Sequence, residues 1–517
     1  DAADLEQGWQ SVMAHTEALP GEDHARFPGA VLLYAHQGRI VLHRGDGWAK
    51  RYADAESELD RGDWLETRTD TIHDMASVSK LFTSIVVMQQ VEAGRIDLNR
   101  TVASYIPQFA EGGKEEVTVR MLLTHTSGFP SWIPLHSKYP DIESRIEAAL
   151  VEPVQNDPGS TYLYSDLNLI CLAVLAERQS GKGLAELVAD GITTPLGMVD
   201  TGYNPPEEKW DRVAATEYQA DPDRGLVWGQ VHDENAWSLG GVAGHAGIFS
   251  TAKDMAALAQ AILNGGWYGT ERILSEESVT AMITNENTDF PGDDHGLGFE
   301  INQRWYMGGF ASPRTVGHTG FTGTSLVIDH PSNSFVVLLT NRVHPSRDWG
   351  SVNPARLAAA NGLADALRIA ALEGKSYWQA SEEPETESTL TLELPDEASE
   401  VRFGLFLDVE SSDPFALETS VDDGETWQFC PYTLDNEQIS EPIGRSGLRA
   451  WQRARATLPE AKKSPRQIRW AQERDKLYEG RGLLVDAIHV RDDSRVILDV
   501  EADPSLLDAD GWTLTDA

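Results

Sequence analysis

The sequence predicts an α/β domain followed by an all-β sandwich. Strand-like segments lie near both ends of the region before residue 375, and mostly helical sequence separates them, as in a layered domain whose sheet is built from distant parts of the chain. Beyond the acidic stretch 381–388, apolar residues recur at every second position, which is the period of a strand with one buried face. We therefore expect an α/β domain over 1–378, a linker over 379–388 and a β-sandwich over 389–517.

The α/β domain begins with a predicted helix over 5–18 and a hairpin over 30–43, whose turn is Gln37-Gly38. The next helix begins near Ser77 and ends before Gly94, because glycine commonly terminates helices. The middle of the domain is mostly helical, with helices expected within 117–128 and over 142–151, 167–179, 184–190, 252–264 and 275–284. The last elements are three strands and a long helix, expected over 315–320, 324–329, 334–340 and 354–372.

The charge of the chain limits the classes of partner. There are 42 Lys and Arg residues against 82 Asp and Glu residues, a formal net charge of −40. Nucleic acids and anionic membrane surfaces are bound by clustered Lys and Arg, so neither is an expected partner. No run of about 18 apolar residues occurs, so no membrane span is expected. The acidic excess fits adaptation to salt, but a soluble protein that repels its own copies is the preferred interpretation.

The two cysteines, Cys171 and Cys430, fall in different predicted domains. A disulfide framework is therefore not expected, and neither is a thiolate metal site, which would need more ligands. We expect no metal and no other cofactor. The chain starts at Asp1 without a recognisable signal peptide, as a processed secreted protein or a trimmed chain would. We expect a secreted or extracytoplasmic protein, with a cytoplasmic one as the alternative.

Ser77 and Lys80, at the start of an apolar helix, are the first candidates for chemistry. Residues three apart share a helix face, so the hydroxyl and the amine are within hydrogen-bond reach. A serine hydroxyl needs a neighbouring base to attack near neutral pH, and a helix N-terminus favours negative charge developing beside Ser77. We expect the apolar neighbours of Lys80 to weaken its preference for the charged form, as a base requires. The alternative is a solvated Ser and Lys on a surface helix.

Two later segments would complete a serine acyl-transfer site. Tyr164 stands just before a predicted helix, and a lysine ammonium nearby would hold its phenol partly ionised, ready to pass a proton to a leaving group. His318-Thr319-Gly320 lies on a predicted edge strand, where glycine lets the backbone come close to a substrate. The N–H groups of Phe321 and Ser77 would then form an oxyanion hole. The alternatives are a tyrosine of the core and an ordinary strand with a bulge.

These motifs, taken in order, resemble those of the serine β-lactamase and penicillin-binding-protein superfamily: Ser77-Val-Ser-Lys80, Tyr164-Ser-Asp166 and His318-Thr-Gly320. Within it, the resemblance is to the group of class C β-lactamases, D-alanyl-D-alanine carboxypeptidases, D-aminopeptidases and family VIII esterases. Segments 122–129 and 240–251 are similar to that group as well, and the resemblance covers about residues 10–375. It implies a β-lactamase-like sheet flanked by helices, together with a helical region.

The resemblance also implies roles for single residues. Ser77 would be the nucleophile, Lys80 the base and Tyr164 the proton relay to the leaving group. Asp166 would face the substrate, and His318 would line the opposite wall with Thr319, Gly320 and Phe321. Many β-lactamases of this group have Asn in place of Asp166 and Lys in place of His318. Lysine would hold a substrate carboxylate as a fixed charge, whereas His is mostly neutral near pH 7, so efficient β-lactam hydrolysis is in doubt.

Three functions follow from the resemblance. The favoured one is hydrolysis of an ester or a D-amino-acid amide through an acyl-enzyme, by a carboxylesterase or a D-peptidase. The second is a class C-like β-lactamase. The third is a penicillin-binding or sensing module that becomes acylated without turnover. The expected small-molecule partner is accordingly an ester, a D-peptide or a β-lactam.

Two other candidate sites compete with this one. Ser238, within Ala236–Gly240, mimics the nucleophile elbow of α/β-hydrolases, but no clear strand precedes it. The run His232-Asp233-Glu234 suggests metal ligands, yet adjacent side chains point apart and no second ligand motif occurs. A polar loop near the cleft is the preferred interpretation of that run.

The predicted β-sandwich rests on five segments with alternating apolar residues, 390–394, 401–407, 415–421, 468–470 and 483–490. Segments 420–427 and 478–488 resemble the jelly-roll modules appended to secreted peptidases of the immune-inhibitor type. That resemblance implies an extracellular role, with contact to glycan or cell wall through exposed Trp. The alternative is that the aromatic residues fill the core of the sandwich.

Overall fold

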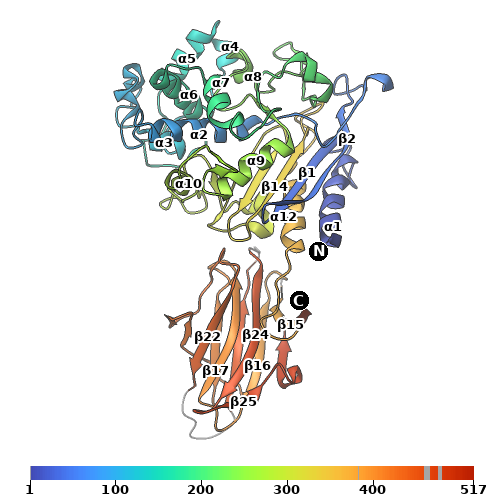
Figure 1. The fold of residues 1–517 in the computed structure, drawn as a ribbon, viewed down its shortest axis with the longest axis vertical. Helices are drawn as coiled ribbons and strands as arrows, with labels where there is room; N and C mark the ends of the chain where they lie inside the picture. Colours follow the sequence, from blue (N-terminus) through green and yellow to red (C-terminus); the bar gives the residue numbers. More distant parts are fainter. Residues whose placement is uncertain (1, 382, 459–465, 476–479) are drawn as a thin grey trace. The chain divides into compact units, whose positions relative to one another are not determined.

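The computed structural model describes residues 2–381, 383–458, 466–475 and 480–517, and this part of the chain divides into two compact units (Figure 1). The larger unit comprises residues 2–307 and 313–363, and the smaller one comprises 308–312 and 364–517. Each unit has its own hydrophobic core. The division near residue 363 falls ahead of the boundary predicted at 378.

The larger unit is built on a seven-stranded antiparallel sheet with strand order β11-β12-β13-β14-β1-β2-β3. The apolar run 30–35 forms most of β1, which is buried on both faces. It pairs with β2 across the predicted hairpin and with β14 from the far end of the unit, so the sheet joins distant parts of the chain as predicted. The strands are β1 (Gly29–His36), β2 (Arg39–Lys50), β3 (Leu65–Glu66), β11 (Glu300–Ile301), β12 (Thr315–Thr319), β13 (Ser325–Asp329) and β14 (Ser334–Thr340).

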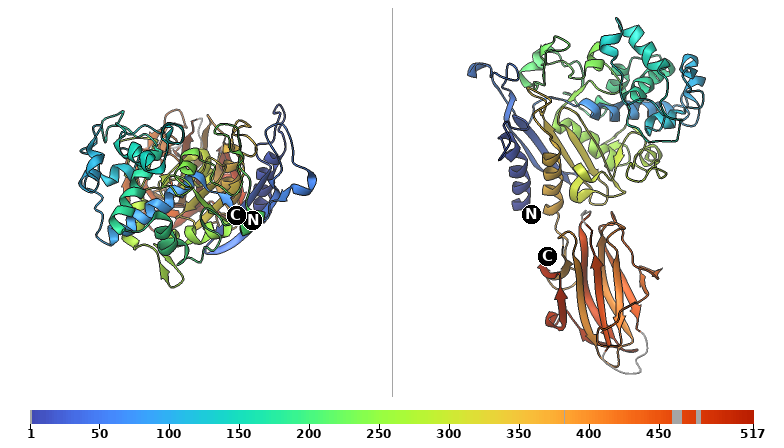
Figure 2. Two further views of the ribbon diagram at one scale, coloured as in Figure 1. Left: turned by 90° about the horizontal axis from the view of Figure 1, so that it is seen from above. Right: turned by 180° about the vertical axis from the view of Figure 1, so that it is seen from behind.

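Helices cover both faces of this sheet. On one face, α1 (Ala2–Met13) and α12 (Asn353–Ala366) run side by side, and they approach so closely that a Cβ added to Gly8 would lie 2.7 Å from the Gly362 Cα (Figure 2). On the other face, α9 (Ala252–Leu263) packs against β14 and β1 (Figure 1). The sheet is therefore the middle layer of a three-layer arrangement.

The helical region is centred on α2 (Ser79–Glu92), which packs against α6 (Asp166–Ser180). Both helices are buried almost all round, which explains why their sequences are apolar on every face. The Ser165 side chain caps the start of α6, and Gly181 ends it with a left-handed backbone. The other helices are α3 (Val119–Leu123), α4 (Leu135–Lys138), α5 (Ile142–Val151), α7 (Leu184–Val188), α8 (Glu234–Ser238), α10 (Glu276–Met282) and α11 (Arg304–Met307).

Short strands complete the larger unit. One three-stranded sheet joins the segment before Ser77 to the segment after His245, with order β4-β8-β5. Two small hairpins, β6–β7 and β9–β10, lie outside it. Their bounds are β4 (His73–Asp74), β5 (Gly202–Tyr203), β6 (Tyr218–Gln219), β7 (Gly225–Leu226), β8 (Ile248–Ser250), β9 (Trp267–Tyr268) and β10 (Glu271–Arg272).

The smaller unit contains two antiparallel sheets whose apolar residues form one core, which confirms the predicted all-β sandwich (Figure 2). One sheet has the order β21-β20-β22-β17-β24-β15-β27, with β25 paired to β24, and the other has the order β19-β18-β23-β16-β26. The principal strands are β15 (Ser376–Ala380), β16 (Glu387–Leu394), β17 (Glu400–Asp408), β18 (Phe415–Ser420), β22 (Trp451–Thr457), β23 (Arg466–Glu473) and β24 (Gly482–Arg491). The shorter ones are β19 (Gln428–Phe429), β20 (Tyr432–Leu434), β21 (Glu437–Ile439), β25 (Val496–Asp499), β26 (Leu507–Asp510) and β27 (Trp512–Asp516).

Two predicted segments near the boundary differ from the structure. The last helix of the larger unit ends at Ala366 instead of 372, because Ile369 and Ala371 pack against the sandwich and the Leu372 N–H donates to Asp486. The segment 379–388, predicted as a linker, includes the end of β15 and the start of β16. Its acidic residues gave no apolar alternation from which the strand ends could be predicted. Whether the predicted boundaries, 1–378 and 389–517, delimit domains that fold independently stays a prediction.

The tryptophans of the smaller unit do not present the exposed surface that glycan contact was expected to use. Trp470 and Trp512 are buried in the sandwich, and Trp427 is half-buried beneath Arg469. The aromatic residues therefore mostly fill the core, which was the alternative prediction. Tyr478 and Glu479, part of the jelly-roll resemblance, lie outside the described residues. No helix in the described part of the chain is long and apolar enough to cross a membrane.

Candidate active site

Ser77 lies in a single 3₁₀ turn, Ala76–Val78, that leads directly into α2. The preceding residue, Ala76, has φ = 44°, a left-handed conformation that costs a residue with a Cβ free energy. The buried Asp74 carboxylate supports it, because one oxygen accepts from the Ala76 N–H at 2.8 Å and the other from the His232 N–H at 2.6 Å. The segment before Ser77 is thus held in a strained shape by charge-assisted hydrogen bonds.

The turn after β12 packs directly on this segment. The Thr322 hydroxyl donates to the Asp74 carbonyl at 2.6 Å, and the Thr324 hydroxyl donates to the Met75 carbonyl at 3.1 Å. A Cβ at Gly320 would overlap both the Met75 carbonyl oxygen and the Thr324 hydroxyl. Gly320 therefore permits a close approach to the chain segment before Ser77, whereas its predicted close approach to a substrate stays a prediction.

Lys80 points at Ser77 from one turn along. Its ammonium donates to Ser77 Oγ at 2.8 Å and to the His245 carbonyl at 3.2 Å, and it pairs with Asp166 Oδ1 at 2.8 Å. The side chain is 1% exposed. Burial alone would lower the pKa of Lys80, but the Asp166 carboxylate and Tyr164 outweigh it, so this pKa lies above its ordinary value. The expectation that Lys80 loses part of its preference for the charged form was wrong, because the Asp166 carboxylate lies beside it.

Tyr164 completes the group. Its hydroxyl interacts with both Lys80 and Ser77, and Lys80 Nζ lies 4.8 Å from the centre of its ring. Burial raises the pKa of Tyr164 to about 12, and the nearby Lys80 ammonium only partly offsets that effect. The phenol is therefore protonated near neutral pH, and the expectation of a partly ionised Tyr164 was wrong. It is placed to donate a proton rather than to accept one.

Asp166 lies where an amide facing the substrate was expected, at the first residue of α6. It is 18% exposed and lines a cavity beside Ser77, yet its main contact is the ion pair with Lys80. The expected contact with substrate therefore competes with a second task, which is holding the charge of Lys80.

Sequence analysis assigned no chemistry to His125, which the structure places against Tyr164. Its ring centre lies 4.6 Å from that of Tyr164, and Nδ1 accepts from the Ser165 N–H at 3.1 Å and from the Asn168 amide at 3.0 Å. Burial, together with the neighbouring His295, keeps the pKa of His125 well below its usual value, so the ring is neutral. The signal available was the segment 122–129, whose similarity to the β-lactamase group was noted without a role for its histidine.

His318 lies on β12 across the cleft from Lys80. Its Nδ1 contacts the Thr319 carbonyl at 2.8 Å, so this nitrogen carries the proton. Burial and the charge of Lys80 lower the pKa of His318 to about 3. His318 is therefore uncharged over the physiological range, in line with the prediction that it is not a fixed cation.

Phe321 differs from its neighbours because its side chain is 50% exposed. The ring stacks on His232 at 5.7 Å, with Arg342 and Arg347 over it. The oxyanion hole expected between the N–H groups of Phe321 and Ser77 stays a prediction.

Two cavities of about 440 Å³ each meet at Ser77, Tyr164 and Phe321. The first, which we call the arginine cavity, is lined by Arg342 and Arg356 together with His318 and Thr319. Arg356 is buried and donates to the carbonyls of Gly320 and Thr324. The second, which we call the acidic cavity, is lined by Asp166, Asp221, Asp233 and Glu234.

The arginine cavity changes one expectation about substrate binding. Sequence analysis doubted carboxylate recognition because His318 replaces a lysine, but two guanidinium groups line the same cavity. Glu300 also lines it, and burial raises the pKa of that carboxyl to about 7. Glu300 is therefore largely neutral below pH 7 and leaves the arginine charges uncompensated there.

The competing sites are used for structural contacts. Ser238 ends the short helix α8 and its hydroxyl donates to the Asn235 carbonyl. In the run His232-Asp233-Glu234, each side chain has a different partner: Glu217, His245 and Arg347, respectively. Asp166, Asp233 and His245 do present potential ligand atoms within 4.8 Å of one another, and the ammonium of Lys80 already lies against Asp166.

The larger unit has the three-layer fold that the motifs predicted. Its Ser77, Lys80 and Tyr164 side chains meet where the two cavities join. The Beta-lactamase family model matches residues 9–361, so the chain belongs to the Beta-lactamase family. A protein of Salmonella schwarzengrund named "Putative D-alanyl-D-alanine carboxypeptidase" is 34% identical over 365 residues, which cover 64% of this chain and 82% of that protein.

Two solved structures share the fold at lower identity. A family VIII carboxylesterase has a TM-score of 0.53 at 23% identity, over 70% of this chain and 97% of its own. A class C β-lactamase from Rhodobacter sphaeroides has a TM-score of 0.54 at 20% identity, over 71% of this chain and 99% of its own. These similarities show the fold, and the chain is a β-lactamase-family hydrolase with an additional C-terminal β-sandwich.

Proposed function

We propose that the protein is a serine hydrolase that cleaves an ester or a D-amino-acid amide through an acyl-enzyme on Ser77. The observation that carries this proposal is the contact of Lys80 Nζ with Ser77 Oγ at 2.8 Å, with the Tyr164 hydroxyl beside both. A hydroxyl, an amine and a phenol that converge on one cleft supply a nucleophile, a base and an acid.

In the proposed reaction, Lys80 must first give up a proton, because its ammonium cannot accept one from Ser77. That proton is lost to solvent, and the Asp166 carboxylate 2.8 Å away makes the loss harder because it stabilises the ammonium. The neutral amine then takes the Ser77 proton as Oγ attacks the substrate carbonyl carbon. The proton on Tyr164 passes to the leaving group as its bond to the carbonyl carbon breaks, and Lys80 restores the Tyr164 proton. Water attacks the acyl-enzyme by the reverse proton path and releases the acid.

The same proposal assigns the negative charge of the tetrahedral intermediate to backbone N–H groups. Ser77 stands at the N-terminus of α2, where N–H groups and the helix dipole favour an anion. The N–H of Phe321, on the turn packed against the Ser77 segment, is the proposed second donor. Gly320, through its close packing on Met75, would set the separation of the two N–H groups.

A class C-like β-lactamase is the second candidate, and the arginine cavity favours it. β-Lactams carry a carboxylate near the scissile amide, and Arg342 and Arg356 line the cavity beside Ser77. The neutral His318 in that cavity argues for the esterase or peptidase instead, since it adds no charge. A module that is acylated by penicillin without turnover remains the third outcome to be tested.

The test is incubation of the protein with a short-chain p-nitrophenyl ester, a D-alanyl-D-alanine peptide, nitrocefin and benzylpenicillin, followed by absorbance and intact mass. Ester or peptide turnover is expected, and it should be abolished in Ser77→Ala. Rapid nitrocefin turnover would favour the β-lactamase, and a lasting penicillin adduct without turnover would favour the sensor. Full activity of Ser77→Ala would refute the nucleophile.

We also propose that the protein acts outside the cytoplasm and that the sandwich has a supporting role there. The resemblance of the sandwich to modules of secreted peptidases supports this proposal, whereas its buried tryptophans give no support for glycan contact. Cell fractionation tests the location. A cell-wall pull-down with the full chain and with the chain ending at residue 363 tests the contact.

A further inference from the structure

We propose that the acidic cavity binds an ammonium group of the substrate, so that the enzyme prefers esters or amides with a protonated amine near the scissile carbonyl. This inference rests on the proposed function, because it takes Ser77 as the reacting group. The cavity has a volume of about 440 Å³ and opens on Ser77, so a group bound in it is part of a substrate that can reach the nucleophile.

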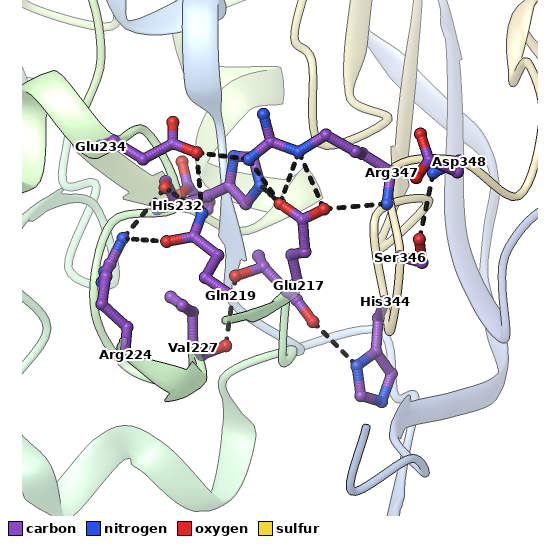
Figure 3. A network of polar contacts seen from close by, with 12 residues as sticks. Glu217, Gln219, Arg224, Val227, His232, Glu234, His344, Ser346, Arg347 and Asp348 are labelled. Atoms are coloured by element: carbon purple, nitrogen blue, oxygen red, sulfur yellow. Dashed lines mark hydrogen bonds and ion pairs between the residues drawn. The ribbon is translucent and has the colours of Figure 1, made fainter. Parts of the chain in front are cut away.

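The wall of the cavity is a fixed network in which most charges are already balanced (Figure 3). Arg347 lies between Glu217 and Glu234 and forms ion pairs with both. Glu217 also accepts from His232 Nε2 at 2.8 Å. Arg224 donates to the Gln219 amide oxygen and to the carbonyls of Val231 and His232, which joins the two chain segments. These groups hold the wall in place and leave little net charge of their own.

Two carboxylates of the cavity have no fixed cationic partner among the described residues. Asp221 lies exposed at the edge of the cavity and forms no ion pair there. Asp233 accepts from the Ala236 N–H and from His245 Nε2, and neither donor carries a permanent charge. Asp166, by contrast, is neutralised by Lys80. An added cation would therefore be attracted mainly by Asp221 and Asp233.

A buried acceptor points to the same kind of ligand. His245 lines the cavity and is 1% exposed, and its Nε2 lies 2.8 Å from Asp233 Oδ1. The proton of a neutral imidazole in this contact is on Nε2, because a carboxylate can only accept. Nδ1 then carries a lone pair, and it has no partner among the described residues. In the neutral ring this buried acceptor lacks a donor, which is costly, and the N–H of a substrate ammonium would satisfy it.

An aromatic ring adds to the attraction. Trp132 lines the cavity and is 44% exposed. The face of an aromatic ring attracts a cation within about 6 Å. The arginine cavity on the other side of Ser77 has the opposite character, since Arg342 and Arg356 would repel the same group. The net charge of −40 does not by itself explain the difference between the two cavities, because both cavities open on the same cleft.

The test uses matched pairs of substrates that differ only in charge. On the acyl side, p-nitrophenyl isonipecotate carries a secondary ammonium where p-nitrophenyl cyclohexanecarboxylate carries a methylene. On the leaving-group side, 2-(dimethylamino)ethyl acetate, whose amine is protonated near neutral pH, is compared with its carbon isostere 3-methylbutyl acetate. We expect a kcat/KM ratio of about tenfold or more in favour of the cation in one of the two pairs at low salt, falling as salt is added.

Variants assign the preference to the cavity. Asp221→Asn should reduce the cation-to-neutral ratio severalfold, whereas Asp223→Asn, an exposed carboxylate two residues away that does not line the cavity, should leave the ratio as it is. A ratio near one in both pairs, with the neutral ester still cleaved by a Ser77-dependent reaction, would overturn the inference and leave the proposed function standing.

A binding measurement separates the inference from turnover. Titration of the Ser77→Ala protein with isonipecotamide and with cyclohexanecarboxamide, followed by calorimetry, compares the charged and neutral probes without any reaction. Tighter binding of the cation, weakened by Asp221→Asn, supports the site even if neither ester is cleaved. Equal binding of the two probes refutes it.

Discussion

Replacement of Asp166 by Asn tests the central electrostatic feature of the site. In the structure, the Asp166 carboxylate lies 2.8 Å from the Lys80 ammonium and holds the pKa of Lys80 above its ordinary value, against the effect of burial. If Lys80 must be neutral to accept the Ser77 proton, activity rises with pH as Lys80 loses its own proton. Removing the carboxylate charge lowers the pKa of Lys80, so the rising limb of the pH profile should move to lower pH.

The size of the shift follows from the geometry. At 2.8 Å, two unit charges attract by about 1.5 kcal/mol in water and by about 6 kcal/mol at an effective dielectric constant of about 20. Lys80 is 1% exposed and Asp166 is 18% exposed, so the pair is closer to the second case. One pKa unit corresponds to about 1.4 kcal/mol, so the pKa of Lys80 should fall by at least about one unit and by as much as about four.

The assay is the pH dependence of kcat/KM for a neutral p-nitrophenyl ester, measured with the native protein, Asp166→Asn and Asp157→Asn. Asp157 is an exposed carboxylate on the segment before Tyr164, so its replacement controls for the loss of one negative charge. The reasoning is refuted if the rising limb of Asp166→Asn stays at the position of the native protein while the variant remains folded. It is also refuted if Asp157→Asn moves the limb equally.

Three further substitutions test other parts of the site. Gly320→Ala should lower ester turnover and reduce stability by about 1–3 kcal/mol in thermal denaturation, because the added Cβ would overlap the Met75 carbonyl. Gly202→Ala is the control, because a Cβ at that position has no neighbouring atom within 4 Å. His125→Ala should cost about 1–3 kcal/mol of stability, because the Ser165 N–H and the Asn168 amide lose their acceptor. It should also lower kcat more than it changes KM, because Tyr164 loses its neighbour. An unchanged kcat would contradict this role. The KM for benzylpenicillin should rise above pH 7, where Glu300, with its pKa of about 7, becomes negative beside Arg356, and Glu300→Gln should remove that rise.

The architecture could be predicted well from the sequence because its signals are local. The apolar run 30–35 and the alternation after residue 388 predict strands by period alone, and Ser77 and Lys80 meet because residues three apart share a turn. Helix 354–372 was predicted too long because its last residues are bound by the sandwich, a tertiary contact with no local signal.

The charge states of the site could not be predicted in the same way. The pKa of Lys80 depends on Asp166, and that of Tyr164 depends on burial, so both are properties of the assembled cleft. His125 was missed for a related reason, since its contact with Tyr164 joins two segments that are separate in sequence. Residue type and spacing therefore indicate which groups can meet, and burial and neighbouring charges decide which of them hold protons.

The same argument explains why the reaction has to be sought in the cavities rather than in the fold. Proteins named as a carboxypeptidase, a carboxylesterase and a β-lactamase share this architecture, so the architecture does not select among them. The cleft of this chain has a neutral His318 among arginines on one side of Ser77, and on the other side it has two carboxylates, Asp221 and Asp233, without a fixed cationic partner among the described residues. A substrate that carried an ammonium and a carboxylate on opposite sides of its scissile bond would meet a complementary charge at each end, whereas an uncharged ester would gain from neither. Comparing such a zwitterionic substrate with its two singly charged analogues therefore tests both cavities in one experiment. Additive gains in the free energy from kcat/KM would show that each cavity binds its own group. No gain over the singly charged analogues would show that the charges serve only to hold the walls together.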